Sequence, residues 1–225
     1  MREKESMKKI TAIQAQRKDP NRVNIYLDGE FAFGLARITA AWLQVGQTLD
    51  EAKIAQLLEE DAHERALRQA LLYLSYRPRS EAEIRQNLRK HAIPEAVIED
   101  TLDKLRQERF ADDSQFARAW VENRAAFRPR ARRLLALELR QKGLTDEVIH
   151  SALQGVDDEA LAYEAASKTV RRLRVQERSV FRKKLSDFLV RRGFSYSVVT
   201  AVVERLCQEI YPEGELHSMD NEETS

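Results

Sequence analysis

The sequence predicts a mainly α-helical protein, a tandem array of three three-helix repeats (nine helices) preceded by a small antiparallel β-hairpin or sheet. Three observations support this fold class. Only seven Gly and five Pro occur among 225 residues, so residues that break helices are scarce. From residue 62 onward, apolar residues recur at helical spacing, and the pattern of turns repeats about every 50 residues. The first 50 residues instead alternate between apolar and polar, as strands do.

The N-terminal region, 1–61, is predicted to contain three antiparallel strands. Turns are indicated by 18–21 and by the pair Asp28-Gly29, which is a strong signal for a two-residue hairpin. The alternating segments that we assign to strands are 10–15, 23–27 and 31–33.

One or two short helices are expected to follow this sheet. A first one is predicted at 39–43, ending near Gly46. Thr48 and Glu51 have the spacing of a capping box, so a second helix is predicted to begin there and to end near residue 60.

The rest of the chain divides into three related units. Arg77-Pro78-Arg79 recurs 51 residues later as Arg128-Pro129-Arg130. Apolar positions keep this offset, so that Leu88 corresponds to Leu139, and a third copy follows 50 residues further on with Leu189. Three copies in register are improbable by chance. The predicted domains are 62–110, 111–156 and 157–211, followed by an acidic and disordered tail, 212–225.

Each unit is predicted to fold into three helices. Ser80 and Glu83 form a capping box, and Thr145 and Ser195 are expected N-caps. Gly143 and Gly193 are expected to end the preceding helices in the left-handed conformation. The predicted helices are 64–75, 80–91, 94–108, 113–126, 131–142, 145–154, 158–175, 178–192 and 195–209.

The residues that carry chemistry in enzymes form no constellation here. Gly29 and Gly34 lack the neighbours of a phosphate-binding loop, and the four histidines are scattered without metal-ligand spacing. Asp112-Asp113 is interpreted as the start of a helix, and Cys207 as a small core residue. Trp42 and Trp120 are interpreted as packing aromatics. We therefore expect a protein that binds a partner, with no catalytic residues, no cofactor and no metal.

Composition also limits where the chain works. No stretch approaches the roughly 18 apolar residues of a membrane span, and the charged start is not followed by the apolar segment of a signal peptide. A single cysteine excludes an internal disulfide and suits a reducing compartment. The sequence thus predicts a cytoplasmic protein that does not insert into membranes.

Basic residues recur at matching positions in the units, although the formal net charge is only +1. They lie in the loop after the first helix of a unit and on its middle helix. Repeats stacked in register would align them into a basic stripe, which suits DNA phosphates or an acidic groove on a protein. The predicted partner-binding residues are Arg77, Arg79, Arg128, Arg130, Arg132, Arg133, Arg182, Lys183 and Lys184.

Several segments together resemble the RecX family, the regulatory proteins of the RecA recombinase. They are Leu27-Asp28-Gly29, the stretch ERFADDSQFARAWVENR (108–124) with the Arg-rich helix after it, LRQKGLTDEVIHSAL (139–153), and its weaker echo LVRRGFSYSVVTAVV (189–203). The resemblance covers nearly the whole chain. It departs from the family pattern where a glycine usually follows the arginine loop, since this chain has Arg79 and Arg130 there.

The resemblance implies a non-enzymatic regulator in DNA repair and homologous recombination. Proteins similar to this one lie along the groove of the RecA filament, inhibit RecA ATPase, strand exchange and co-protease activity, and so limit the SOS response. The expected partner is the RecA filament, and the chain itself is expected to be a monomer. An alternative stays open, in which the three-helix units bind DNA directly, single- or double-stranded, with the basic helix in a groove.

Overall fold

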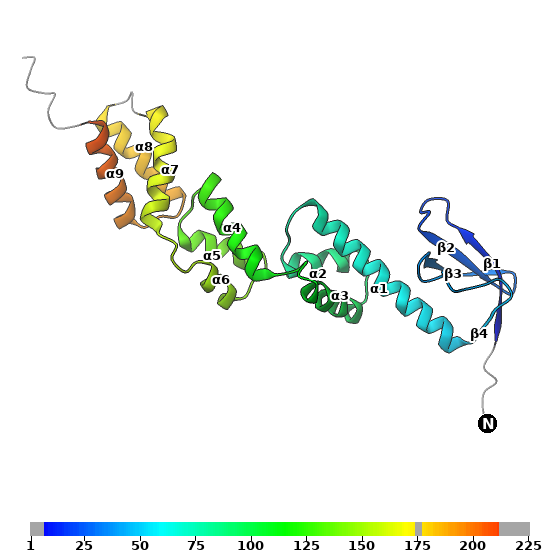
Figure 1. The fold of residues 1–225 in the computed structure, drawn as a ribbon. Helices are drawn as coiled ribbons and strands as arrows, with labels where there is room; N and C mark the ends of the chain where they lie inside the picture. The colour runs from blue at the N-terminus through cyan, green and yellow to red at the C-terminus, as the bar shows by residue number, and fades with distance from the viewer. Residues whose placement is uncertain (1–6, 174–176, 212–225) are drawn as a thin grey trace, which may run out of the picture. The chain divides into compact units, whose positions relative to one another are not determined.

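The computed structural model describes residues 7–173 and 177–211. The chain divides into two compact units, Met1–Asp112 and Asp113–Ser225, each with hydrophobic cores of its own. Within the described ranges lie nine helices, three in the first unit and six in the second, which confirms the predicted fold class (Figure 1). None of these helices is both long and apolar enough to span a bilayer. The predicted tail, 212–225, lies outside the described residues.

The first unit begins with an antiparallel sheet of strand order β3-β2-β1-β4 (Figure 1). Asp28 and Gly29 both have positive φ, 51° and 93°, as a tight hairpin between β2 and β3 requires, and this confirms the predicted turn. Ile10, Ile25 and Leu35 are fully buried on one face of the sheet. The strands are β1 (Lys8–Ala15), β2 (Arg22–Leu27), β3 (Glu30–Ala36) and β4 (Thr48–Leu49).

The segment between β3 and β4 differs from the prediction. Residues 37–42 form turns and not a helix, because the chain returns at once to the sheet, where the Gly46 N–H donates to the Ile10 carbonyl at 2.8 Å. A five-residue segment gains too few helical hydrogen bonds to resist this tertiary pairing. Trp42 is 89% exposed, so its interpretation as a packing aromatic is wrong. Strand β4 has two residues, too few for a periodic signal in sequence.

One helix, α1 (Glu51–Tyr76), replaces the two helices predicted between residues 51 and 75. Its N-cap is Asp50, whose side chain accepts from the Lys53 N–H at 2.7 Å, so the predicted capping role of Thr48 is wrong. The apolar spacing fades midway because the early turns of α1 pack on the sheet and the later turns pack on α2 (Glu81–Lys90) and α3 (Glu95–Gln107).

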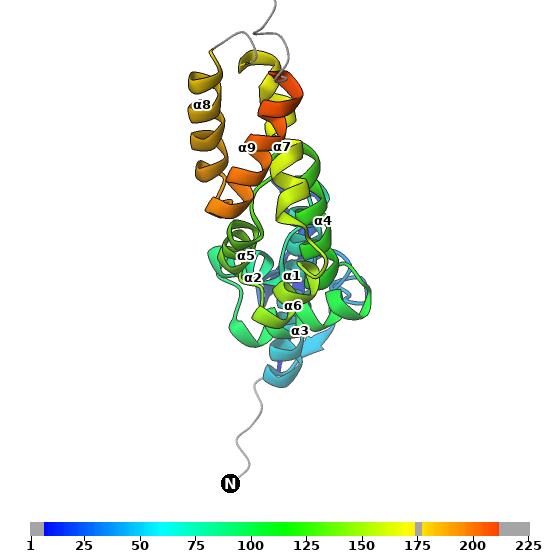
Figure 2. The ribbon, with the colours of Figure 1, turned by 90° about the vertical axis from the view of Figure 1, so that its left-hand side faces the viewer.

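The second unit contains two three-helix repeats. In the first of them, Phe116, Leu135 and Leu139 lead a buried core that Trp120 joins as predicted. In the second, α8 packs against α7 and α9 (Figure 2), around a core that contains Phe181 and Cys207, and this confirms Cys207 as a core residue. The helices are α4 (Asp113–Phe127), α5 (Arg132–Gln141), α6 (Asp146–Ala152), α7 (Asp158–Leu173), α8 (Arg178–Arg191) and α9 (Tyr196–Ile210).

The turn after the middle helix is the same in all three repeats. Gly143 and Gly193 have φ of 82° and 87°, which confirms the predicted left-handed ends. Thr145 and Ser195 cap the next helices as predicted. In the first repeat Ala92 takes the same conformation with φ of 54°, although a Cβ atom disfavours it. The register of the repeat thus fixes this backbone geometry even where glycine is missing.

Candidate interaction surface

The nine predicted contact residues fall into three places. Arg77 and Arg79 lie in the loop between α1 and α2 of the first unit. In the second unit, Arg128 and Arg130 lie in the loop between α4 and α5, and Arg132 and Arg133 form the first turn of α5. The last three, Arg182, Lys183 and Lys184, lie on α8 and are exposed.

In the first unit the arginines of the loop are already engaged. Arg77 forms an ion pair with Glu83 at 2.9 Å. The guanidinium of Arg79 lies over the ring of Tyr73, 3.9 Å from its centroid, in a cation–π contact. Neither Arg79 nor Arg130, which stand where the family pattern has a glycine, has a positive φ that would call for glycine.

Acidic residues also neutralise the arginines of α2, the middle helix of the first repeat. Arg89 pairs with Glu95 at 2.6 Å, and Arg85 pairs with both Glu95 and Glu99. The hydrogen bond from Arg89 lowers the pKa of the Glu95 carboxyl, so this acid is held in its charged form. The basic face of this repeat therefore offers little free positive charge to a partner.

In the second unit the carboxylate of Glu138 binds three side chains next to the loop between α4 and α5. Glu138 on α5 accepts from Trp120 Nε1 at 2.8 Å, Arg124 Nε at 2.7 Å and Arg130 Nη1 at 2.5 Å. Burial by itself raises the pKa of Glu138, but the bonds from Arg124 and Trp120 outweigh it, and the pKa is lowered. Arg130 is thus a residue that anchors the loop, as Arg79 is in the first unit.

The same loop is joined to the turn between α8 and α9. Arg192 Nη1 donates to the Pro129 carbonyl at 2.8 Å, and Arg133 Nε donates to the Gly193 carbonyl at 2.5 Å. The two repeats approach so closely there that a Cβ on Gly193 would lie 2.6 Å from Leu134 Cγ. These contacts bring basic residues of both repeats together.

The side chain of Arg192 at this junction lies near other cations and forms no ion pair with a carboxylate among the described residues. Burial lowers the pKa of Arg192, and the positive charges of Arg130 and Arg128 lower it further. Arg192 lies in the basic segment of the sequence but outside the predicted set, since its contact with a residue 63 positions away has no local signal.

In the second unit, free cations lie in the loop between α4 and α5, on the first turn of α5, and on and just after α8. Within the described residues the charged side-chain groups of the following residues form no ion pair with a carboxylate: Arg128, Arg132, Arg133, Arg182, Lys183, Lys184, Arg191 and Arg192. Arg132, Arg133 and Arg140 line an open groove of about 550 Å³ beside α6, together with Asp146, which pairs with Arg140 at 2.8 Å. Asp158 also lines this groove and accepts from the Arg132 N–H at 2.7 Å. This exposed cationic surface suits an anionic partner.

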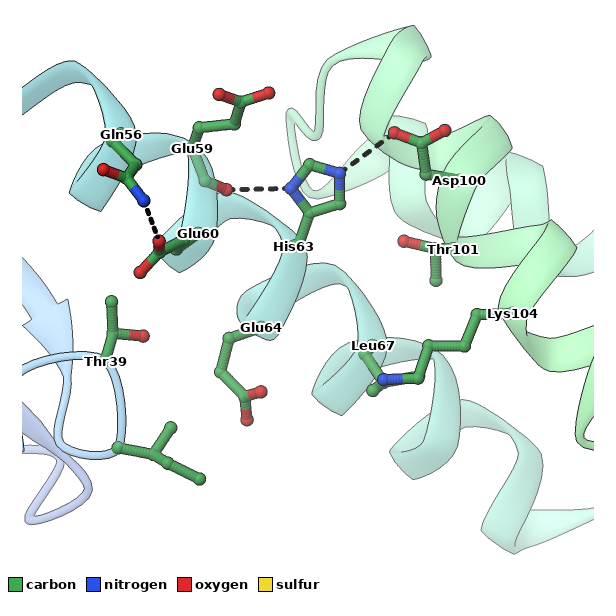
Figure 3. Close-up of a pocket in the computed structure, with 11 residues that line it drawn as sticks. Thr39, Gln56, Glu59, Glu60, His63, Glu64, Leu67, Asp100, Thr101 and Lys104 are labelled. Carbon is green, nitrogen blue, oxygen red and sulfur yellow. Dashed lines mark hydrogen bonds and ion pairs between the residues drawn. The ribbon is translucent and has the colours of Figure 1, made fainter. Parts of the chain in front are cut away.

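The first unit has an open pocket of similar volume, but it is acidic in character. Figure 3 shows His63 on α1 between the Glu59 carbonyl, 2.9 Å from Nδ1, and the Asp100 carboxylate on α3, 3.0 Å from Nε2. Glu60 and Glu64 line the same pocket. The hydrogen bond to Asp100, followed by that to the Glu59 carbonyl, raises the pKa of His63 above 6.5.

His63→Ala is expected to destabilise the protein more at pH 5.5 than at pH 8.5. A raised folded-state pKa means that the stabilisation is complete below 6.5 and is lost as pH rises through the folded value. Because both side chains are more than a third exposed, the difference should stay below about 1 kcal/mol. Urea unfolding at both pH values measures it, and in an Asp100→Asn background the difference should shrink, because only Glu59 then raises the pKa of His63. An equal cost at both pH values would contradict this account.

Family comparisons agree with this architecture segment by segment. Residues 8–50 match the family model of the regulatory protein RecX N-terminal domain. Residues 66–105, 112–153 and 157–203 match its first, second and third three-helix domains. The chain belongs to the RecX family. It matches the protein named Regulatory protein RecX of Bacillus licheniformis at 32% identity, over 87% of this chain and 76% of that protein.

Other RecX proteins show the same relation. The one from Limosilactobacillus reuteri is 34% identical over 93% of this chain and 80% of its own length. A crystal structure of regulatory protein RecX superposes with a TM-score of 0.64 at 33% identity, over 88% of this chain and 99% of that one. RecX from Lactobacillus salivarius, at 24% identity and a TM-score of 0.57 over 65% of this chain and 97% of that one, supports the fold alone.

Proposed function

We propose that this RecX-family protein binds the RecA filament and inhibits RecA ATPase, strand exchange and co-protease activity, which would limit recombination and SOS induction in the cytoplasm. The observation that carries the proposal is the exposed cationic surface of the second unit, together with membership of a family of regulatory proteins. The action is one of binding, without covalent chemistry.

A repeated protein is well suited to a repeated partner. Contacts made by successive repeats to neighbouring filament subunits raise the effective concentration of each further contact, so that weak contacts together hold a polymer. In this account the second and third repeats supply the main charged contact. The first repeat, whose Arg77, Arg85 and Arg89 are paired with acids, contributes less of the electrostatic attraction.

The test is RecA ATP hydrolysis with single-stranded DNA in saturating excess over RecA. A regulator that binds the filament itself inhibits hydrolysis whether or not free DNA remains. We therefore expect the same inhibition when single-stranded DNA just saturates RecA and when it is in tenfold excess over that amount. A protein that only competes for DNA would lose its effect as DNA is added. That result would replace this proposal with the DNA-binding alternative.

A further inference from the structure

Two exposed aromatic residues occupy equivalent places in successive repeats. Tyr76 is the last residue of α1 and Phe127 is the last residue of α4, and their numbers differ by 127 − 76 = 51, the offset of the repeat. Both side chains belong to residues that are 75% exposed. Each is followed by Arg-Pro-Arg. Packing within the chain explains neither ring, since neither belongs to a hydrophobic core.

Contacts with the rest of the second unit hold the loop that follows Phe127 in place. Arg130 is bound to Glu138 at 2.5 Å, and Pro129 is buried and receives Arg192 on its carbonyl at 2.8 Å. These contacts fix the residues that follow Arg128, while Phe127 and Arg128 remain at the surface. A rigid loop presents its exposed ring and guanidinium with little loss of conformational entropy on binding.

Cationic groups surround the position of Phe127 in the chain. Arg128 is exposed and has no acidic partner among the described side chains. Lys168 on α7 donates to the carbonyl of Ala126, the residue before Phe127, at 2.7 Å, and also pairs with Glu164 at 3.0 Å. Arg192 reaches the carbonyl of Pro129 two residues after the ring. An exposed aromatic ring among cations is the arrangement on which a nucleic-acid base stacks while its phosphates contact the basic groups.

We propose that Phe127 and Arg128 form a binding site for single-stranded nucleic acid, in which a base stacks on the ring of Phe127 and a phosphate contacts Arg128. Arg192, which forms no ion pair with a carboxylate among the described residues, supplies further positive charge. Tyr76 and Arg77 form a weaker second copy, because Glu83 already neutralises Arg77. This inference goes beyond the proposed regulation of RecA and does not depend on it.

A single strand fits this site better than a protein surface or a duplex. Protein hot spots sit in a patch of apolar neighbours, whereas Phe127 is flanked in sequence by Ala126 and Arg128 at the surface. The bases of a duplex are stacked on one another and offer no free face to a protruding ring. The isolated ring beside an unpaired guanidinium therefore favours an unpaired base.

The experiment measures binding of a fluorescent oligothymidine of about 20 nucleotides by anisotropy, with Phe127→Tyr and Phe127→Leu compared. Tyrosine keeps a ring that can stack, so binding should stay within about twofold of wild type. Leucine keeps apolar surface without a stacking face, and we expect Kd to rise about tenfold. Arg128→Ala should weaken binding and reduce the slope of log K against log salt by about 1.

Arg118→Ala is the matched charge control, because Arg118 is exposed on the same helix two turns or more from the loop and should leave Kd unchanged. Circular dichroism of each variant verifies that the fold is retained. Equal Kd for Phe127→Leu and wild type would overturn the proposal. A loss of RecA inhibition in Phe127→Leu with oligothymidine binding intact would also overturn it, and would assign the ring to a protein contact.

Discussion

Asp61→Ala is expected to lower the free energy of unfolding of the first unit by about 3–5 kcal/mol. Asp61 on α1 is 4% exposed and accepts from Arg22 Nη1 at 3.2 Å, from Arg22 Nη2 at 3.0 Å and from the Ala36 N–H at 2.5 Å. Alanine would leave the buried guanidinium without a counter-charge and the N–H without an acceptor. Because the pair ties α1 to β2 and β3, urea unfolding followed by circular dichroism should register the loss.

Two comparisons make this prediction specific. The double variant Arg22→Met, Asp61→Leu removes both charges together and should be less destabilised than Asp61→Ala, since no unpaired charge remains buried. Asp100→Ala removes a carboxylate that is 63% exposed and should cost less than about 1 kcal/mol. If Asp61→Ala were no more costly than Asp100→Ala, the ion pair would not join the helix to the sheet.

The repeat architecture was predictable because its signals are local. Capping residues such as Ser80, Thr145 and Ser195 satisfy backbone N–H groups within three residues, and Gly143 and Gly193 relieve a backbone constraint at their own position. The apolar residues that face each core recur at helical spacing. Such features depend on short stretches of chain, so a sequence pattern that repeats three times reveals them.

The errors lie where distant contacts decide the local structure. The first half of α1 packs on the sheet and the second half packs in the first helical core. Its apolar residues therefore do not keep one regular spacing, and the sequence pattern resembles a break between two helices. The segment that contains Trp42 does not form the predicted helix, because the chain after it pairs as β4 with β1. The partners of Asp61 lie 25 and 39 residues away, and no spacing rule connects them.

The sequence predicts which basic residues belong to the candidate surface, but it does not predict which of them are paired with acids. Sequence identifies arginines at equivalent positions, such as Arg77 and Arg128, without showing that one is paired and the other is not. That distinction depends on Glu83, which lies on the helix after the first loop and reaches back to it. Arg192, which joins the second and third repeats, becomes part of the surface only through folding.

Reversing three of the free charges should abolish most of the proposed regulation. Arg128, Arg132 and Arg133 are exposed, and their guanidinium groups form no ion pair with a carboxylate in the described part of the chain. The variant Arg128→Glu, Arg132→Glu, Arg133→Glu would replace attraction to an anionic partner by repulsion. We expect at least a tenfold loss of apparent affinity for the RecA filament, and a flatter dependence on salt because fewer ions are released on binding.

A control of equal charge change comes from the first unit. Arg17, Lys18 and Arg37 are exposed and also have no acidic partner within the described residues. Changing these three residues to glutamate alters the net charge by the same amount away from the proposed surface. Since Arg133 also donates to Gly193, urea unfolding of both variants is needed to show that the fold persists.

The most direct measurement is a titration of RecA ATP hydrolysis with wild type and the two charge-reversed variants, from substoichiometric ratios upward at constant salt. The account predicts inhibition by wild type and by the control variant at the same concentrations, and inhibition by the Arg128, Arg132, Arg133 variant only at concentrations at least tenfold higher. Equal inhibition by all three proteins would contradict it and remove this surface from the interaction with the filament.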